Sequence, residues 1–243
     1  MKLLPSWRRH APLLGTALWI ATTPALAFDI PPPPPPLYQG LILPLFPNGT
    51  TIPFSGQSGS LSTTDKRRAE PPGATLANGQ AQPETHAREL AQLVPPAHRE
   101  QMAQAYLQAF NGYRQLERKL GLENNDLAGS IAAFIAGNYM ALNNVDLPDP
   151  HFQKLAAQLR QSLPRNPGYT QLSVASKRKL YEQTAMVGTF MAVARLSFQQ
   201  KPNPAAERHY RESARANLEL VLQTPAEQVR IDAQGLHLGP QGR

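Results

Sequence analysis

The stretch that decides the fold is NDLAGSIAAFIAGNYMAL, residues 125–142. Between Leu127 and Leu142 nearly every residue is apolar or small, which is typical of a helix buried on most of its sides. Asn125 and Asp126 are the candidate N-caps. The apolar run is too short and too closely flanked by polar residues to cross a bilayer, which takes roughly 20 apolar residues. The sequence therefore predicts a buried central helix from Asp126 to about Leu142.

A second long helix is predicted over 173–200, with Ser173 as its N-cap. Its apolar seam is spaced four and three residues apart and consists of Leu180, Thr184, Val187, Met191, Ala194 and Phe198. Both helices carry a stripe of small residues, namely Gly129, Ala133 and Gly137 in the first and Ala185, Gly188 and Ala192 in the second. Small residues at this spacing let two helix backbones approach closely. We expect these two helices to form the central pair.

Outward from this pair, apolar periodicity predicts further helices over 84–94, 96–120, 149–163 and 203–222. Gly121 favours a C-cap, and Asp149-Pro150 and Asn203-Pro204 are typical helix starts. Apolar and polar residues alternate on both sides of Gly235, which predicts a small hairpin over 229–238. The expected fold is all-α: a compact bundle of five or six helices with a C-terminal β-hairpin.

The first 27 residues have the pattern of a cleavable secretory signal. Basic residues at Lys2, Arg8 and Arg9 precede an apolar segment, residues 11–21, and Ala25-Leu26-Ala27 forms an A-x-A cleavage site. We expect cleavage between Ala27 and Phe28 and a mature chain that is periplasmic or extracellular, with no transmembrane segment. An uncut N-terminal anchor is the alternative.

Residues 28–83 differ in composition from the rest, with 12 prolines and 6 glycines. This content is typical of low-complexity segments, and Pro31–Pro36 predicts a short polyproline II rod. The apolar patch at 37–47 either packs on the domain or docks into a groove of a partner. Residues 55–83 resemble a plain flexible linker. The predicted organisation is a signal peptide at 1–27, a Pro-rich arm at 28–83, a helical domain at 84–223, and a hairpin and tail at 224–243.

Composition argues against several classes of function. The formal charge is +7, of which +3 lies in residues 1–27, so the mature chain is only modestly basic and nucleic-acid binding is not expected. There is no cysteine, hence neither a disulfide framework nor a thiolate metal site. The histidines lack metal-ligand spacing, and all of them except His10 lie in polar contexts that predict surface positions. Nucleotide-binding glycine motifs are absent. A S-x-x-K match at Ser176–Lys179 lacks its partner motifs. We expect no cofactor, no metal and no catalytic residue.

Two groups of residues remain as weak candidates. The basic residues that could contact an anionic polymer are Arg165, Lys177, Arg178 and Lys179. They lie near a helix N-terminus, which also favours anions, but a solvated face explains them equally. The polar residues inside apolar helices are Asn138 and Glu182, which either fix helix register or, for Glu182, supply a general acid.

Two segments carry a family resemblance. The first segment resembles domain-of-unknown-function family 6683 in residues 125–134 and in Gly137-Asn138-Tyr139. The second is the closing segment 217–238, which resembles the same family and contains Val229-Arg230-Ile231-Asp232. The resemblance covers roughly residues 84–238 and leaves the Pro-rich segment outside. It implies an exported, all-helical bacterial protein and carries no catalytic residues.

These observations favour a non-catalytic exported interaction protein with an unknown partner in the envelope, contacted through the arm. One alternative is an envelope hydrolase or transferase that uses Glu182 or Asp126. The other is a binder of anionic surface polymers through residues 165–179.

Overall fold

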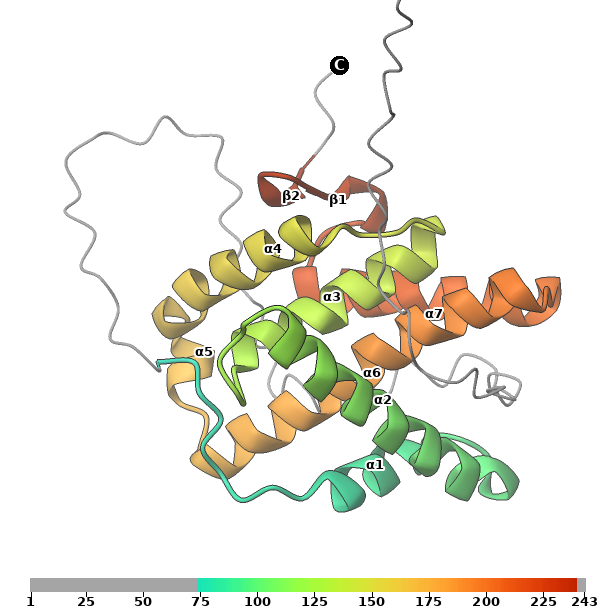
Figure 1. Ribbon diagram of the computed structural model, residues 1–243, viewed down its shortest axis with the longest axis horizontal. Coiled ribbons are helices and arrows are strands. Elements are labelled where there is room, and N and C mark those ends of the chain that lie inside the picture. Colours follow the sequence, from blue (N-terminus) through green and yellow to red (C-terminus); the bar gives the residue numbers. More distant parts are fainter. Residues whose placement is uncertain (1–73, 240–243) are drawn as a thin grey trace, which may run out of the picture.

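The structure is a computed structural model that describes residues 74–239 (Figure 1). The expectations for the signal peptide and for most of the arm therefore lie outside the described residues. In chain order the helices and strands are α1 (Pro83–Ala91), α2 (Arg99–Lys119), α3 (Leu127–Asn143), α4 (Asp149–Ser162), α5 (Pro167–Thr170), α6 (Val174–Gln200), α7 (Pro204–Leu222), β1 (Val229–Asp232) and β2 (Gly235–Leu238). The all-α prediction with a C-terminal hairpin is confirmed. The short α5 was not predicted.

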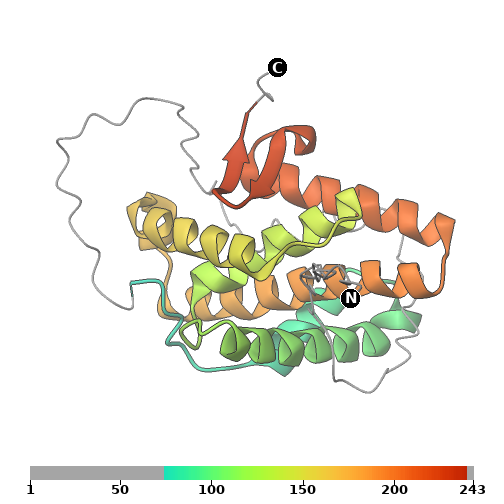
Figure 2. The ribbon, with the colours of Figure 1, turned by 45° about the horizontal axis from the view of Figure 1, so that its top comes forward.

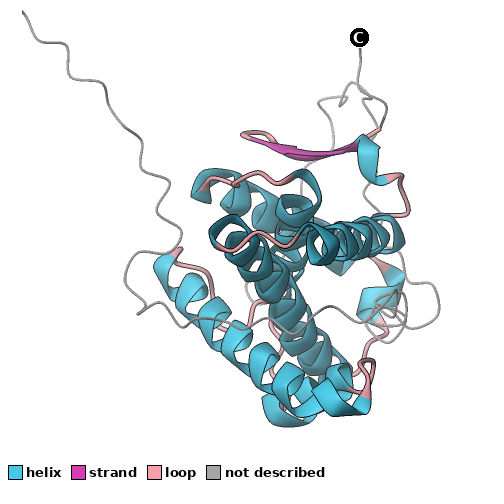
Figure 3. Cartoon of the chain, turned by 90° about the vertical axis from the view of Figure 1, so that its right-hand side faces the viewer, coloured by secondary structure: helices cyan, strands magenta, loops and turns pink. Residues whose placement is uncertain are grey.

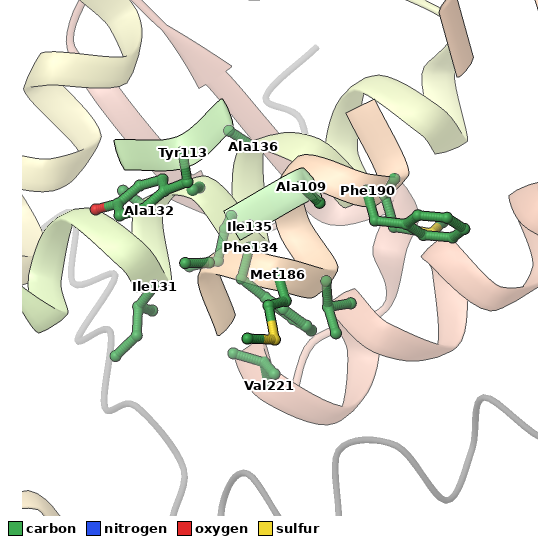
Figure 4. Close-up of a cluster of buried hydrophobic side chains, with 14 of the residues drawn as sticks. Ala109, Tyr113, Ile131, Ala132, Phe134, Ile135, Ala136, Met186, Phe190 and Val221 are labelled. Atoms are coloured by element: carbon green, nitrogen blue, oxygen red, sulfur yellow. The ribbon is translucent and has the colours of Figure 1, made fainter. Parts of the chain in front are cut away.

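Helix α3 lies at the centre of the bundle. It packs most extensively on α6, and α4 and α7 cover other sides of it. Figure 2 shows α7 and the hairpin on one side of α3, with α2 and α1 on the other. Almost every α3 side chain is buried, as its uniformly apolar sequence predicts. In the core, Phe134 of α3, Met186 of α6 and Val221 of α7 belong to one cluster of buried apolar side chains (Figure 4).

The backbones of α3 and α6 touch, which confirms the predicted central pair. A Cβ added to Gly137 would lie 2.7 Å from the carbonyl carbon of Gly188, and one added to Gly188 would overlap the carbonyl of Ala133. The prediction is wrong for Gly129, whose missing Cβ instead leaves room for the Tyr113 hydroxyl of α2, 2.8 Å away. The first turn of α3 thus approaches α2.

The hairpin lies against α4, on the outside of the bundle (Figure 3). Its strands pair antiparallel, with Val229 opposite Leu238 and Asp232 opposite Gly235. Gln158 of α4 accepts a hydrogen bond from the Leu236 amide at 2.7 Å, and its side chain fills the space where a Cβ of Gly235 would stand. Gly235 also has a φ of +111°, so the turn requires glycine both for the space that Gln158 fills and for its backbone conformation.

The end of the expected arm packs on the bundle. Residues 75–82 were predicted to belong to a flexible linker, yet Ala77 is fully buried and Thr75 nearly so. The packed part of the chain therefore includes residues 75–82, ahead of the predicted domain start at 84. Among residues 74–239, no helix is both long enough and apolar enough to cross a membrane.

Candidate functional site

Many of the buried polar groups gather where residues 74–82, called the strap below, run along the bundle edge into α1 (Figure 1). The strap is held chiefly through its backbone. Ala77 donates its amide to the Asn125 carbonyl at 2.9 Å, and the Thr75 carbonyl accepts from the Leu127 amide at 3.0 Å. The hydroxyl of Tyr169 donates to the Ala74 carbonyl at 2.8 Å. The strap is thus fixed to the start of α3 and to α5.

Glu182 of α6 is the centre of the first cluster. It is 0% exposed, and both of its oxygens are occupied. Nε of Arg178 donates to Oε1 at 2.6 Å, and His86 Nδ1 lies 2.6 Å from Oε2. The Gln82 amide donates to both oxygens, at 3.2 and 3.3 Å. Burial alone would raise the pKa of Glu182, but the hydrogen bonds and charges of His86 and Arg178 outweigh it and lower that pKa below its ordinary value.

Arg178 connects this carboxylate to two other elements. Its Nη1 donates to the side-chain oxygen of Asn125 at 2.9 Å and to the Ala77 carbonyl at 3.4 Å. Its guanidinium lies over the Tyr181 ring, 5.2 Å from the centroid. The side chain joins α6, the strap and the turn before α3. Arg178 therefore has a structural partner for most of its donors.

Asp126 forms the second cluster. Its Oδ1 accepts from the Thr75 hydroxyl at 2.6 Å and from the Ala128 amide at 3.1 Å, which makes it the N-cap of α3. Its Oδ2 accepts from Arg160 Nε at 3.1 Å and also from the second guanidinium nitrogen. Asp126 is fully buried, so this carboxylate too is enclosed and paired.

Glu117 of α2 is a third buried carboxylate, one that sequence reasoning missed. The Tyr181 hydroxyl and the Asn125 amide donate to its Oε1 at 2.9 and 3.2 Å, and Arg114 Nε lies 3.3 Å from Oε2. Burial raises the pKa of Glu117 above its ordinary value, although these partners oppose the rise. Burial, together with the charge of Glu117, also raises the pKa values of Tyr113 and Tyr181. The sequence did contain a signal for the burial of Glu117. It follows Tyr113 by four residues, so the two side chains lie on the same face of α2.

His86 was expected at the surface, like the other histidines outside the signal. It is buried instead, because its position in α1 faces Glu182 of α6 across the end of the strap. Within residues 74–239, no group of three or more histidine, aspartate or glutamate side chains is placed to hold a metal ion. The chemistry of the clusters is therefore that of ion pairs and hydrogen bonds between elements.

The predicted basic group does not converge on one site. Arg165 is exposed near the start of α5, and Lys177 lies over the Tyr169 ring, 4.3 Å from its centroid. Arg178 is only 5% exposed and faces inward. Lys179 pairs with Glu89 of α1 at 2.7 Å. Neighbours in sequence thus point to different surroundings because α6 turns each residue by about 100°.

Asn138 lies where the sequence suggested, in the buried middle of α3. Its amide nitrogen donates to the Phe134 carbonyl at 2.8 Å, and its oxygen accepts from Asn217 of α7 at 2.8 Å. A second polar pair, Ser130 and Thr184, joins α3 to α6 at 2.9 Å. These bonds set the position of α3 against its two neighbours.

Comparison with protein families identifies the family to which the chain belongs. Residues 48–239 match a family described as a family of unknown function, DUF6683, and the chain belongs to it. The resemblance found in the sequence is confirmed, but the match begins at residue 48, so its exclusion of the whole segment 28–83 was wrong. No curated protein and no solved structure gives a significant match.

Proposed function

We propose that this member of the DUF6683 family is a non-catalytic exported protein that binds a protein partner in the bacterial envelope, with the Pro-rich arm as its contact. In this proposal the signal peptide is removed near Ala27/Phe28, and the mature chain acts in the periplasm or outside the cell. The observation that carries the proposal is the complete enclosure of Glu182 and Asp126, the two carboxylates that the sequence offered as catalytic candidates.

A general acid or base must come within hydrogen-bond distance of its substrate, about 2.6–3.2 Å or one water away. Glu182 and Asp126 are both 0% exposed, and every one of their oxygens already accepts from a side chain or backbone donor. A general acid also benefits from a raised pKa, whereas that of Glu182 is lowered. These features support a structural role for both carboxylates.

The strap attaches the last residues of the arm to the bundle at a defined position. Hydrogen bonds to Thr75, Ala77 and Gln82 fix the last residues before α1, so the chain follows one path along the bundle from residue 75 into α1. Such an attachment supports an arm that presents itself to a partner while the bundle serves as a scaffold. The apolar patch at 37–47 is the part of the arm with side chains suited to a partner groove.

The test is affinity capture from envelope extracts. The exported chain should retain a partner that a chain lacking residues 28–73 loses, with both proteins equally stable. Glu182→Gln should retain the partner in proportion to its folded fraction, and Glu89→Gln, at an exposed ion pair, is the matched control. A Glu182→Gln protein that folds normally and keeps its partner, yet abolishes the cellular phenotype, would contradict the non-catalytic proposal.

A further inference from the structure

At the end of the bundle away from the strap, a cavity of about 170 Å³ lies between the last turn of α3, the last turns of α6 and the first turns of α7. An engineered apolar cavity of about 150 Å³ holds a benzene molecule, so this volume suits a ligand of similar size. The lining residues are Ala141, Asn144, Arg195, Phe198, Gln199, Pro202, Glu207 and Tyr210. Apolar and aromatic groups form part of this wall, and one cation and one anion stand in the rest.

Arg195 supplies the cation, and it is only 7% exposed. Its Nε donates to the side-chain oxygen of Asn144 at 3.2 Å, and its Nη1 donates to Asp146 at 2.6 Å. These two anchors fix the plane of the guanidinium. Nη2 donates to no acceptor among residues 74–239, which leaves it available to a ligand carboxylate. A fixed, largely desolvated guanidinium binds a carboxylate more strongly than a free surface one does.

Glu207 supplies the anion. Arg211 donates to its Oε1 at 2.7 Å, whereas Oε2 accepts no hydrogen bond within the described part of the chain. The rings of Phe198 and Tyr210 line the same cavity, with their centroids 5.1 Å apart in an edge-on arrangement. A carboxylate oxygen beside aromatic rings is a favourable site for an ammonium group, which gains both an ion pair and a cation–π contact.

We propose that this cavity binds a small aliphatic α-amino acid as its zwitterion. The ligand carboxylate pairs with Arg195, its ammonium with Glu207, and its side chain packs on Phe198 and Ala141. A ligand with a single charge would gain only one of these two charge-assisted hydrogen bonds. This binding site is independent of the proposed partner and of the arm.

The first test uses the unaltered full chain and three ligands of nearly equal shape, titrated by calorimetry. L-Valine carries both charges, L-valinamide lacks the carboxylate, and N-acetyl-L-valine lacks the ammonium. A charged hydrogen bond contributes about 1.5–3 kcal/mol, so each modified ligand should bind at least about ten-fold more weakly. The proposal is overturned by equal affinity for all three, or by no binding of L-valine up to about 10 mM.

Variants then place the ligand. Arg195→Gln and Glu207→Gln should each weaken L-valine binding about ten-fold or more, and Lys201→Gln, an exposed neighbour outside the lining, should leave it unchanged. Ala141→Leu keeps both charges but fills the cavity, so it should abolish binding. Circular dichroism confirms that each variant is folded. Unchanged L-valine affinity in folded Ala141→Leu would also overturn the proposal.

Discussion

Replacing Gly137 with alanine tests the contact on which the whole bundle depends. The added Cβ would lie 2.7 Å from the carbonyl carbon of Gly188 and 3.1 Å from its Cα, and still closer to its carbonyl oxygen. Carbon atoms in contact are about 3.5–4.0 Å apart, so α3 and α6 would have to separate by roughly 1 Å. The atoms that collide belong to backbone, and no side-chain rotation relieves them.

The magnitude follows from two opposing effects. Overpacking a core costs about 1–3 kcal/mol, and a conflict between backbones belongs at the upper end. Alanine favours a helix over glycine by about 1 kcal/mol, which offsets part of the cost. The net loss should be about 2 kcal/mol. With a urea m-value of about 2 kcal/mol/M, the unfolding midpoint should fall by about 1 M.

The assay is urea unfolding followed by far-ultraviolet circular dichroism, with Gly112→Ala of α2 as the matched control. A Cβ at Gly112 would meet the Thr189 methyl at 3.6 Å, an ordinary contact. The control should therefore be neutral or more stable by up to about 1 kcal/mol. The reasoning is refuted if Gly137→Ala is as stable as the unaltered chain, or if both substitutions shift the midpoint alike.

Three further outcomes are expected. Mass spectrometry of the exported protein should find Phe28 at the N-terminus, and an intact Met1 would exclude cleavage. Removing residues 28–73 should leave the melting temperature nearly unchanged, whereas removing 28–82 should lower it by about 5–10 °C because the strap is lost, and equal melting of both would refute its role. Because the folded pKa of Glu182 is lowered, its contribution to stability is present above the unfolded pKa of about 4.3 and is lost as pH falls through the folded value. Glu182→Gln should therefore lose less stability between about pH 5 and pH 3 than the unaltered chain, as acid titration of urea midpoints will show.

The elements were predictable because their signals are local. Ser173 and Asn203 cap α6 and α7 through side-chain bonds to the Ser176 and Ala206 amides, at 3.1 Å each. The glycines in the middle of α3 and α6, Gly137 and Gly188, also indicated their pairing, because a close contact between two helix backbones requires glycine. Both kinds of signal lie within a few residues, so one sequence suffices to find them.

The strap and the residues that contact it could not be predicted in the same way. Thr75 and Ala77 sit in a composition typical of linkers, and their partners lie 51 and 101 residues away, at Asp126 and Arg178. The residues next to Thr75 and Ala77 in the sequence carry no pattern that predicts such contacts. The inward orientation of Arg178 was likewise not predicted, because Arg178 lies within a run of three basic residues. Its spacing of four residues from Glu182 on one helix did, however, indicate an ion pair.

The arrangement of the clusters explains why charge is buried at this end of the bundle. The strap has few large apolar side chains, so hydrophobic burial alone gives it little preference for one position. Backbone donors such as the Gln82 amide need acceptors, and a buried carboxylate is a strong one. Burying Glu182 is costly unless Arg178 and His86 pair with it, and removing either would leave a charge unpaired. The ion pairs therefore define where the strap lies. Substitutions of exposed strap residues such as Asn78 and Gln80 should accordingly be tolerated better than substitutions of the residues that contact the strap.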